Sequence, residues 1–206
     1  MFLAAGDLVL LGNQLWPWHE IVFLPSSENP AFDLALILPS YAGLIWWITG
    51  NHRGRFNRAL AEGIFLGPLS GLLLMAQIVL QAQAGGGLDG KSYGLWAGAG
   101  VLWAIAGGRG ARAAGHGGMG LFAGGWSAVT GCLMAATFLL VRMIPAAGSI
   151  GSSEALRQAD AQTMGDPATV QMLQSLQPVE GVLLLGLLAG AVLGLVFGML
   201  AKPRQD

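Results

Sequence analysis

The sequence has one cysteine and few charged side chains. Cys132 lies inside an apolar run, which excludes an internal disulfide and any cysteine-pair metal or redox motif. Charged residues make up 10% of the chain, against about a quarter in an ordinary soluble domain. The net charge of -1 leaves no basic patch that could neutralise many phosphates, so we expect no nucleic-acid partner. Water is therefore not the main solvent of this chain.

Motifs for catalysis and for cofactor binding are also lacking. There is no His-rich box, no Gly-x-Ser-x-Gly elbow and no nucleophile beside a base. His52 and His116 fall in expected loops and His19 near a helix end, whereas an intramembrane haem needs histidines that project from facing helices. The glycine-rich stretch 107–112 has neither a preceding strand nor a P-loop lysine. We expect no enzyme activity and no cofactor or metal.

What the sequence does contain is long apolar segments, since 54% of its residues are hydrophobic. A transmembrane helix needs about 20 mainly apolar residues. Five segments meet or approach this length: Ala31–Thr49, Leu60–Gln81, Ser92–Gly107, Met119–Ile144 and Val179–Leu200. They predict an all-α integral membrane protein with at least five transmembrane helices.

Residues 1–30 predict an amphipathic N-terminal helix followed by a turn. On a helical wheel, Asp7, Gln14 and Glu20 fall on one side and leucines on the other. Such a helix either lies flat in the membrane interface or crosses as a sixth span with its polar face turned into the bundle. The segment is long enough to cross, and we favour the sixth span.

The rest of the chain divides into three regions. Residues 31–144 form a four-helix transmembrane region, and residues 179–206 form the last span with its tail. Between them, residues 145–178 are too polar for the hydrocarbon and too few for a core of their own. Asp166 followed by Pro167 is typical of a helix start. We expect two short helices here, forming a lid outside the membrane.

The basic residues orient this set of spans. Short cytoplasmic loops carry an excess of Lys and Arg. Seven of the ten basic residues fall on one side of the expected membrane: Arg53, Arg55, Arg58, Arg109, Arg112, Lys202 and Arg204. This alternation predicts a bacterial inner-membrane protein with a cytoplasmic C-terminus.

Glycines recur at four-residue intervals in several spans. In hydrocarbon, small residues promote helix association because they let two backbones approach closely. The predicted packing faces comprise Gly63, Gly67 and Gly71 in the second span and Gly186, Gly190, Gly194 and Gly198 in the last. These faces either pack against one another within the chain, or the last one meets another subunit.

Ionisable groups within or near the spans are few. Asp33, Glu180 and Arg142 are all placed near the outer ends of spans. We expect either an ion pair between Arg142 and one of the acids, or three side chains that separately reach the interface. At the inner boundary, Glu62 follows Arg58 by four residues, which favours a local helical pair.

A transport pathway is suggested by helix breaks and polar side chains. Paired interruptions of transmembrane helices can expose backbone carbonyls that bind a substrate or ion. The candidate pathway consists of Pro39, Pro68, Gln77 and Gln81 with the polar side of the first helix, namely Asp7, Gln14 and Glu20. No acidic relay at mid-depth accompanies them, although proton- or cation-coupled carriers normally need one.

These features favour a non-catalytic subunit or organiser of a larger membrane complex, held together by close glycine packing. The alternative is a small channel or transporter with a path at Pro39 and Pro68. Membrane lipids and other membrane-protein subunits are the expected partners.

Overall fold

The computed structural model describes residues 6–7, 9–10, 30–50, 54–83, 90–150 and 167–201. Within these ranges the chain is helical apart from the turn at residues 115–118 and the bend at Ala201, and it contains no strand. Its long helices are α3 (Pro30–Gly50), α4 (Gly54–Gln83), α5 (Gly90–Ala114), α6 (Met119–Ile150) and α8 (Pro167–Leu200). Most of the expected N-terminal helix, with Gln14 and Glu20, lies outside the described residues.

Three of these helices are long and apolar enough to cross a membrane. The spans are Asn57–Gln81 in α4, Met119–Arg142 in α6 and Pro178–Leu200 in α8. Each coincides closely with one of the segments expected from the sequence. The segments expected in α3 and α5 are helical as well. That α3, α5 and the N-terminal helix also cross the membrane stays a prediction.

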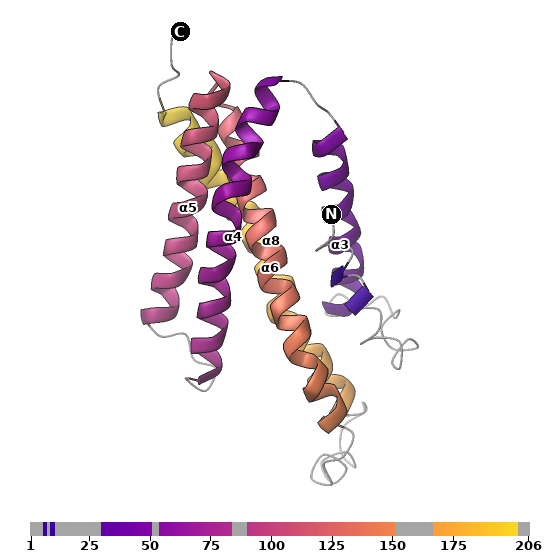
Figure 1. The fold of residues 1–206 in the computed structure, drawn as a ribbon. Helices are drawn as coiled ribbons and strands as arrows, with labels where there is room; N and C mark the ends of the chain where they lie inside the picture. The colour runs from indigo at the N-terminus through magenta and orange to yellow at the C-terminus, as the bar shows by residue number, and fades with distance from the viewer. Residues whose placement is uncertain are drawn as a thin grey trace.

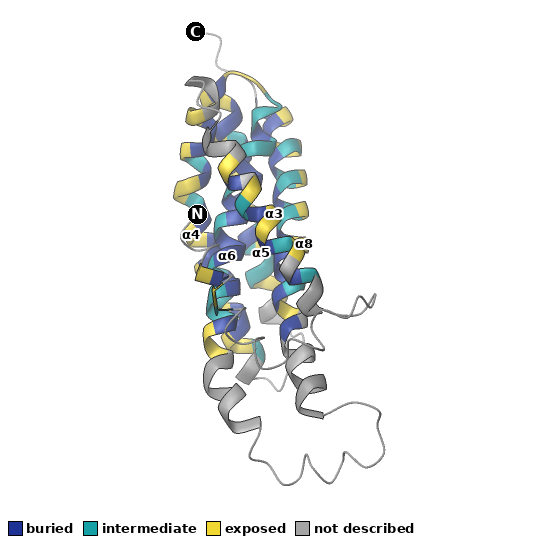
Figure 2. Ribbon diagram, turned by 90° about the vertical axis from the view of Figure 1, so that its right-hand side faces the viewer, coloured by how far each residue is buried: buried dark blue, intermediate teal, exposed yellow. Residues whose placement is uncertain are grey.

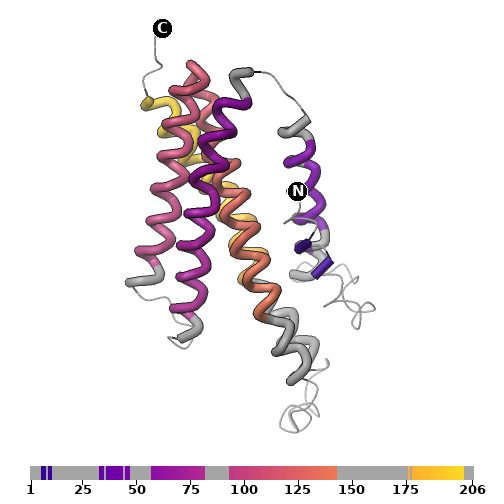
Figure 3. The backbone as a smooth tube through the Cα atoms, viewed as in Figure 1, coloured from indigo at the N-terminus to yellow at the C-terminus, as the bar shows by residue number. Residues whose placement is uncertain are grey.

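Four of the helices form one bundle, and α3 stands beside it (Figure 1). Helices α5 and α6 lie next to each other, and both contact α4 on one side and α8 on the other. Helix α3 packs against α8 and makes little contact with α4, the helix that follows it in the chain. The tube in Figure 3 shows the same separation between α3 and α4.

A tight turn joins α5 to α6 and makes them antiparallel neighbours. Gly115 has a φ of 69°, which glycine adopts without steric cost. The amide of His116 donates to the carbonyl of Ala111 at 3.1 Å, and that of Gly115 to Arg112 at 3.2 Å, which is a Schellman motif. The Nδ1 atom of His116 then accepts from the amide of Gly118 at 3.1 Å, ahead of the first turn of α6. His116 thus has a structural role in this turn.

Helix α8 is longer than the sequence analysis expected. The helix start at Pro167 is where it was expected, because proline suits the first helical position. However, the expected short helix does not end before the last span: α8 runs without interruption through Pro178 to Leu200. Helix α6 likewise extends to Ile150. The other expected short helix of the lid falls in residues 151–166, outside the described part.

The buried residues lie on the sides of the helices that face one another, and the exposed residues lie on the outside of the bundle (Figure 2). Many core positions are small, including Ala99, Ala128, Ala135 and Ala136. Helix α3 contributes larger side chains at three- and four-residue steps: Leu34, Leu38, Tyr41 and Ile45. The Tyr41 hydroxyl donates to the carbonyl oxygen of Leu183 at 2.5 Å, which ties α3 to α8.

Candidate functional site

The glycine face of α8 lies against α6 of the same chain. A Cβ atom built at Gly194 would meet the Gly120 carbonyl oxygen at 2.5 Å, and one at Gly198 would meet the Gly117 oxygen at 2.5 Å. Gly190 lies in the same way against Ala128 and Gly186 against Cys132. The face from Gly186 to Gly198 is therefore covered within the chain, and this corrects the alternative that it meets another subunit.

The glycine face of α4 lies against another side of α6. A Cβ at Gly63 would stand 2.6 Å from the carbonyl oxygen of Ala123, and one at Gly67 2.7 Å from the Thr130 Cβ. At Gly71 the nearest atom is the Cβ of Met134, at 3.1 Å. Helix α6 is thus held between two glycine faces. Gly63 and Gly67 leave no room for a side chain, and at Gly71 the contact with α6 is tight.

Three helices meet at one small-residue junction near the start of α6. Gly107 of α5, Gly120 of α6 and Gly194 of α8 are in mutual backbone contact, and a Cβ at Gly120 would lie 2.9 Å from the Gly107 oxygen. One turn along α5, Gly110 packs against Ala123 and Ala59. This junction fixes the spacing of α5, α6 and α8 at the end of the bundle that carries Arg109 and Arg112.

A buried hydrogen-bond chain links α5 to α4. The indole Nε1 of Trp103 donates to Ser70 Oγ at 3.0 Å, and this hydroxyl donates to the Gly67 carbonyl at 2.8 Å. Trp103 is 1% exposed and Ser70 fully buried. The sequence analysis did not single out either residue. A buried tryptophan usually has an acceptor for its N–H, but nothing in the sequence indicates that Ser70 of α4 is this acceptor.

The described residues of the expected transport pathway do not converge. Pro39 and Pro68 lie on exposed positions of α3 and α4, and both helices are continuous there, which corrects the expectation of helix breaks. Gln77 donates through Nε2 to the Oε1 of Gln81 at 2.7 Å, one turn further along the same helix. Each amide thus has a partner on its own helix.

Asp7 is the described member of the polar N-terminal face, and it is buried against α6. The hydroxyl of Thr137 donates to Asp7 Oδ1 at 2.6 Å and also lies 2.8 Å from the carbonyl of Leu133. The other carboxylate oxygen of Asp7 is buried without a hydrogen bond. The polar side of this segment therefore turns toward the bundle at this residue.

Of the two alternatives for Arg142, the ion pair with Asp33 or Glu180 is not formed. The Arg142 guanidinium lies instead 5.8 Å from the ring centroid of Phe138, one turn earlier on its own helix. The contact with Phe138 is local, so it fixes Arg142 without any contribution from α3 or α8.

An ion pair at the opposite end of the bundle does connect two helices. Arg109 Nε of α5 is 2.9 Å from Glu62 Oε2 of α4. The sequence analysis expected Glu62 to pair with Arg58 on its own helix. The α4–α5 packing brings Arg109 within reach of Glu62, which spacing along a single helix cannot predict.

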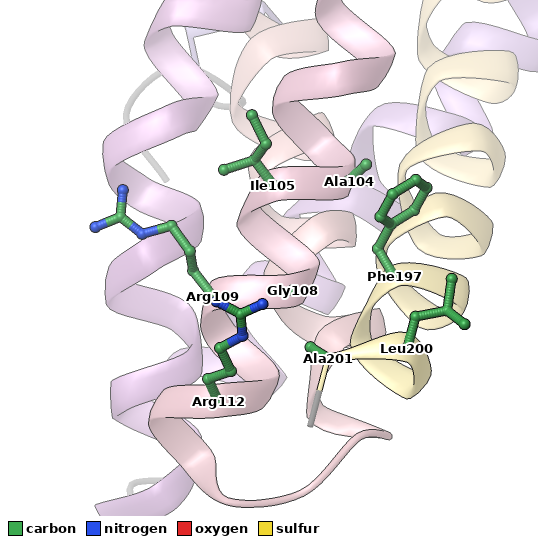
Figure 4. Close-up of a pocket in the computed structure, with 8 residues that line it drawn as sticks. All are labelled: Ala104, Ile105, Gly108, Arg109, Arg112, Phe197, Leu200 and Ala201. Atoms are coloured by element: carbon green, nitrogen blue, oxygen red, sulfur yellow. The ribbon is translucent and has the colours of Figure 1, made fainter. Parts of the chain in front are cut away.

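Two neighbouring cavities lie between α5 and α8. The larger, about 360 Å³, has an apolar lining that includes Trp96, Gly100, Trp103 and Leu193. The smaller, about 300 Å³, is lined at one end by Arg109 and Arg112 and is drawn in Figure 4. Ala104 and Phe197 border both cavities. Within the described residues, no group of three His, Cys, Asp or Glu side chains is placed to hold a metal ion.

No family model, curated protein or solved structure matches this chain.

Proposed function

We propose that this chain is a non-catalytic subunit of a larger membrane complex, in which its glycine-packed bundle is a rigid scaffold. The observation that carries the proposal is the outer face of α4, which is apolar and which α3 leaves uncovered. Ile64, Phe65, Leu69 and Leu72 on this face are about half or more exposed, and Phe65 is 86% exposed. Helix α3 packs on α8 instead, although it directly precedes α4.

The opposite face of α4 supports the same proposal. Gly63, Gly67 and Gly71 fix this helix against α6 through backbone contacts. The outer side chains are therefore presented at defined positions, and a rigid surface loses little conformational entropy on binding. A transmembrane helix of another subunit is the partner that we propose for this face, with membrane lipids around the rest of the bundle.

The orientation is part of the proposal. Arg58 near the start of α4 and Arg109 and Arg112 near the end of α5 belong to the same end of the bundle (Figure 1). The positive-inside rule places such an end in the cytoplasm. We therefore propose a bacterial inner-membrane location with a cytoplasmic C-terminus.

The transport alternative has less support. Its two prolines lie on exposed faces of continuous helices, and Gln77 and Gln81 bond to each other. In the described spans, these four residues therefore do not form a common polar surface along which a solute could move.

Purification of the full chain from its native membranes in a mild detergent tests the proposal. We expect the wild-type chain to purify in a complex of fixed stoichiometry. The Phe65→Ser variant should dissociate from the other subunits of this complex. The matched control is Leu185→Ser, on the exposed side of α8, where the native residue is 63% exposed. A homogeneous particle of this chain alone that moves solute across liposomes would instead establish the transporter. Equal effects of the two variants would remove the assignment to α4.

A further inference from the structure

The two cavities between α5 and α8 lie end to end along the helices. Small residues at four-residue steps on α5, namely Gly100, Ala104 and Gly108, line them. The space beside Gly108 is less filled than the space beside Gly107, because a Cβ at Gly108 would meet its nearest atom only at 3.7 Å. At Gly108, α5 and α8 are therefore less closely packed than at Gly107, where a Cβ would meet the Gly194 backbone. We call the two cavities together the α5–α8 groove.

The groove changes from apolar to basic along its length. Trp96, Val101 and Leu193 line one end, and Arg112 lines the other. Arg109 extends toward α4, where it pairs with Glu62, whereas the Arg112 side chain folds back along α5 toward Gly108 (Figure 4). Among the described residues, Arg112 has no ion pair.

The length of the groove matches one leaflet of a bilayer. From Arg112 to Trp96 a helix rises about 24 Å, and from Arg109 to Trp96 about 20 Å. One leaflet of a typical bilayer with its headgroups is about 20–22 Å thick. A groove with this span that ends at a cation has the dimensions of a single lipid chain beneath its headgroup.

We propose that the α5–α8 groove binds one anionic phospholipid, with its phosphate at Arg112 and an acyl chain along the Trp96 end. The inference rests on the membrane placement of the bundle and not on the identity of any partner subunit. The negative charge of the phosphate complements the Arg112 guanidinium, which has no ion pair within the described part of the chain. The apolar end of the groove accommodates the acyl chain.

The size and polarity of the groove distinguish this occupant from two others. A partner helix is about 10 Å across with its side chains, which two cavities of about 300 and 360 Å³ do not accommodate. Free phosphate would use the arginine end and leave the tryptophan end without a function. Only an amphipathic molecule uses both ends.

Native mass spectrometry of the full chain in detergent tests the proposal. The probes are phosphatidylglycerol and phosphatidylcholine with identical acyl chains. We expect one tightly held lipid and a preference for phosphatidylglycerol of about fivefold, the equivalent of one cationic side chain near a membrane surface. Inorganic phosphate at millimolar concentration should not displace it.

Variants separate the two ends of the groove. Arg112→Gln should abolish the headgroup preference, Arg112→Lys should retain most of it, and Arg58→Gln, an exposed cation outside the groove, should leave it unchanged. Ala97 is exposed and lines the apolar end of the groove, so Ala97→Phe should weaken the binding of both lipids. Ala76→Phe, at an exposed position of α4, should not weaken it.

Three results would overturn the proposal. They are an unchanged preference in Arg112→Gln, equal lipid binding in Ala97→Phe and Ala76→Phe, or displacement of phosphatidylglycerol by inorganic phosphate. Thermal unfolding of each variant shows whether it is folded. If Arg112→Gln is not, the Ala97→Phe and Ala76→Phe pair decides the question by itself.

Discussion

The α6 helix and the α3 helix are packed in opposite ways. Helix α6 meets α4 and α8 through glycines, with carbonyl oxygens and Cα atoms where side chains would otherwise stand. Helix α3 packs against α8 and contributes Leu34, Leu38 and Tyr41 to the buried core, while Gly43 has nothing within 4 Å of a built Cβ. Glycine thus allows close packing in the contacts of α6, whereas Gly43 has no such role in α3.

The difference follows from what drives association in lipid. Because lipid tails are as apolar as leucine, burying an apolar side chain gains little, and close packing and interhelical hydrogen bonds dominate. The α6 contacts use close backbone approach over several turns. The α3 contact uses side-chain interdigitation and one hydrogen bond, from Tyr41 to Leu183. We therefore expect the α6 contacts to tolerate substitution least.

The largest effect is expected for Gly194→Leu. A side chain at this position must displace the Gly120 oxygen at 2.5 Å and the Gly124 Cα at 2.8 Å, both of which belong to backbone. We expect the free energy of unfolding to fall by about 3 kcal/mol, which is in the upper part of the range for overpacked cores. Thermal unfolding of the purified protein in detergent measures it. Gly43→Leu on α3 is the matched control and should change little; comparable losses in the two variants would contradict the distinction between α6 and α3.

A smaller loss is expected for Ser70→Ala. This change removes the acceptor of the buried Trp103 N–H and so leaves a polar group unpaired. The expected cost is about 1–2 kcal/mol. Ser40→Ala on α3 is the control, because the Ser40 hydroxyl is exposed and donates only to Leu36 of its own helix at 2.7 Å.

Thermal unfolding again compares the two serine variants. A Ser70→Ala protein as stable as Ser40→Ala would mean that the link from α5 to α4 contributes nothing beyond packing. The Trp103→Phe variant separates the hydrogen bond from packing. In a protein that already carries Trp103→Phe, Ser70→Ala should lower the free energy of unfolding by a smaller amount.

The sequence predicted the helices better than it predicted their contacts. Apolar length located the spans in α4, α6 and α8, because hydrocarbon thickness sets the length of a span irrespective of its neighbours. The four-residue spacing of Gly186 to Gly198 identified a packing face. It did not identify the helix against it, because the same spacing serves a contact within the chain and one between chains.

The ion pairs illustrate the same limit. From its place near the outer ends, Arg142 was expected either to pair with Asp33 or Glu180 or to reach the interface separately, and Glu62 was expected to pair with Arg58 from their spacing. The structure places Arg142 over Phe138 and Glu62 beside Arg109. Position along a span gives the depth of a side chain but not the direction in which it points. The α5–α8 groove was not predictable either, because it depends on how two helices cross.

The smallest of the three effects is expected for Tyr41→Phe. The substitution removes one hydroxyl and keeps the ring, so α3 loses its hydrogen bond to Leu183 with its packing unchanged. We expect a destabilisation of about 1 kcal/mol that is confined to α3. Hydrogen exchange should therefore speed up in α3 and stay the same in α4 and α6, because the glycine contacts do not depend on α3. The control is Tyr93→Phe, whose side chain is 60% exposed on α5. Faster exchange throughout the bundle would mean that α3 is an integral part of the core and that the two kinds of packing are coupled.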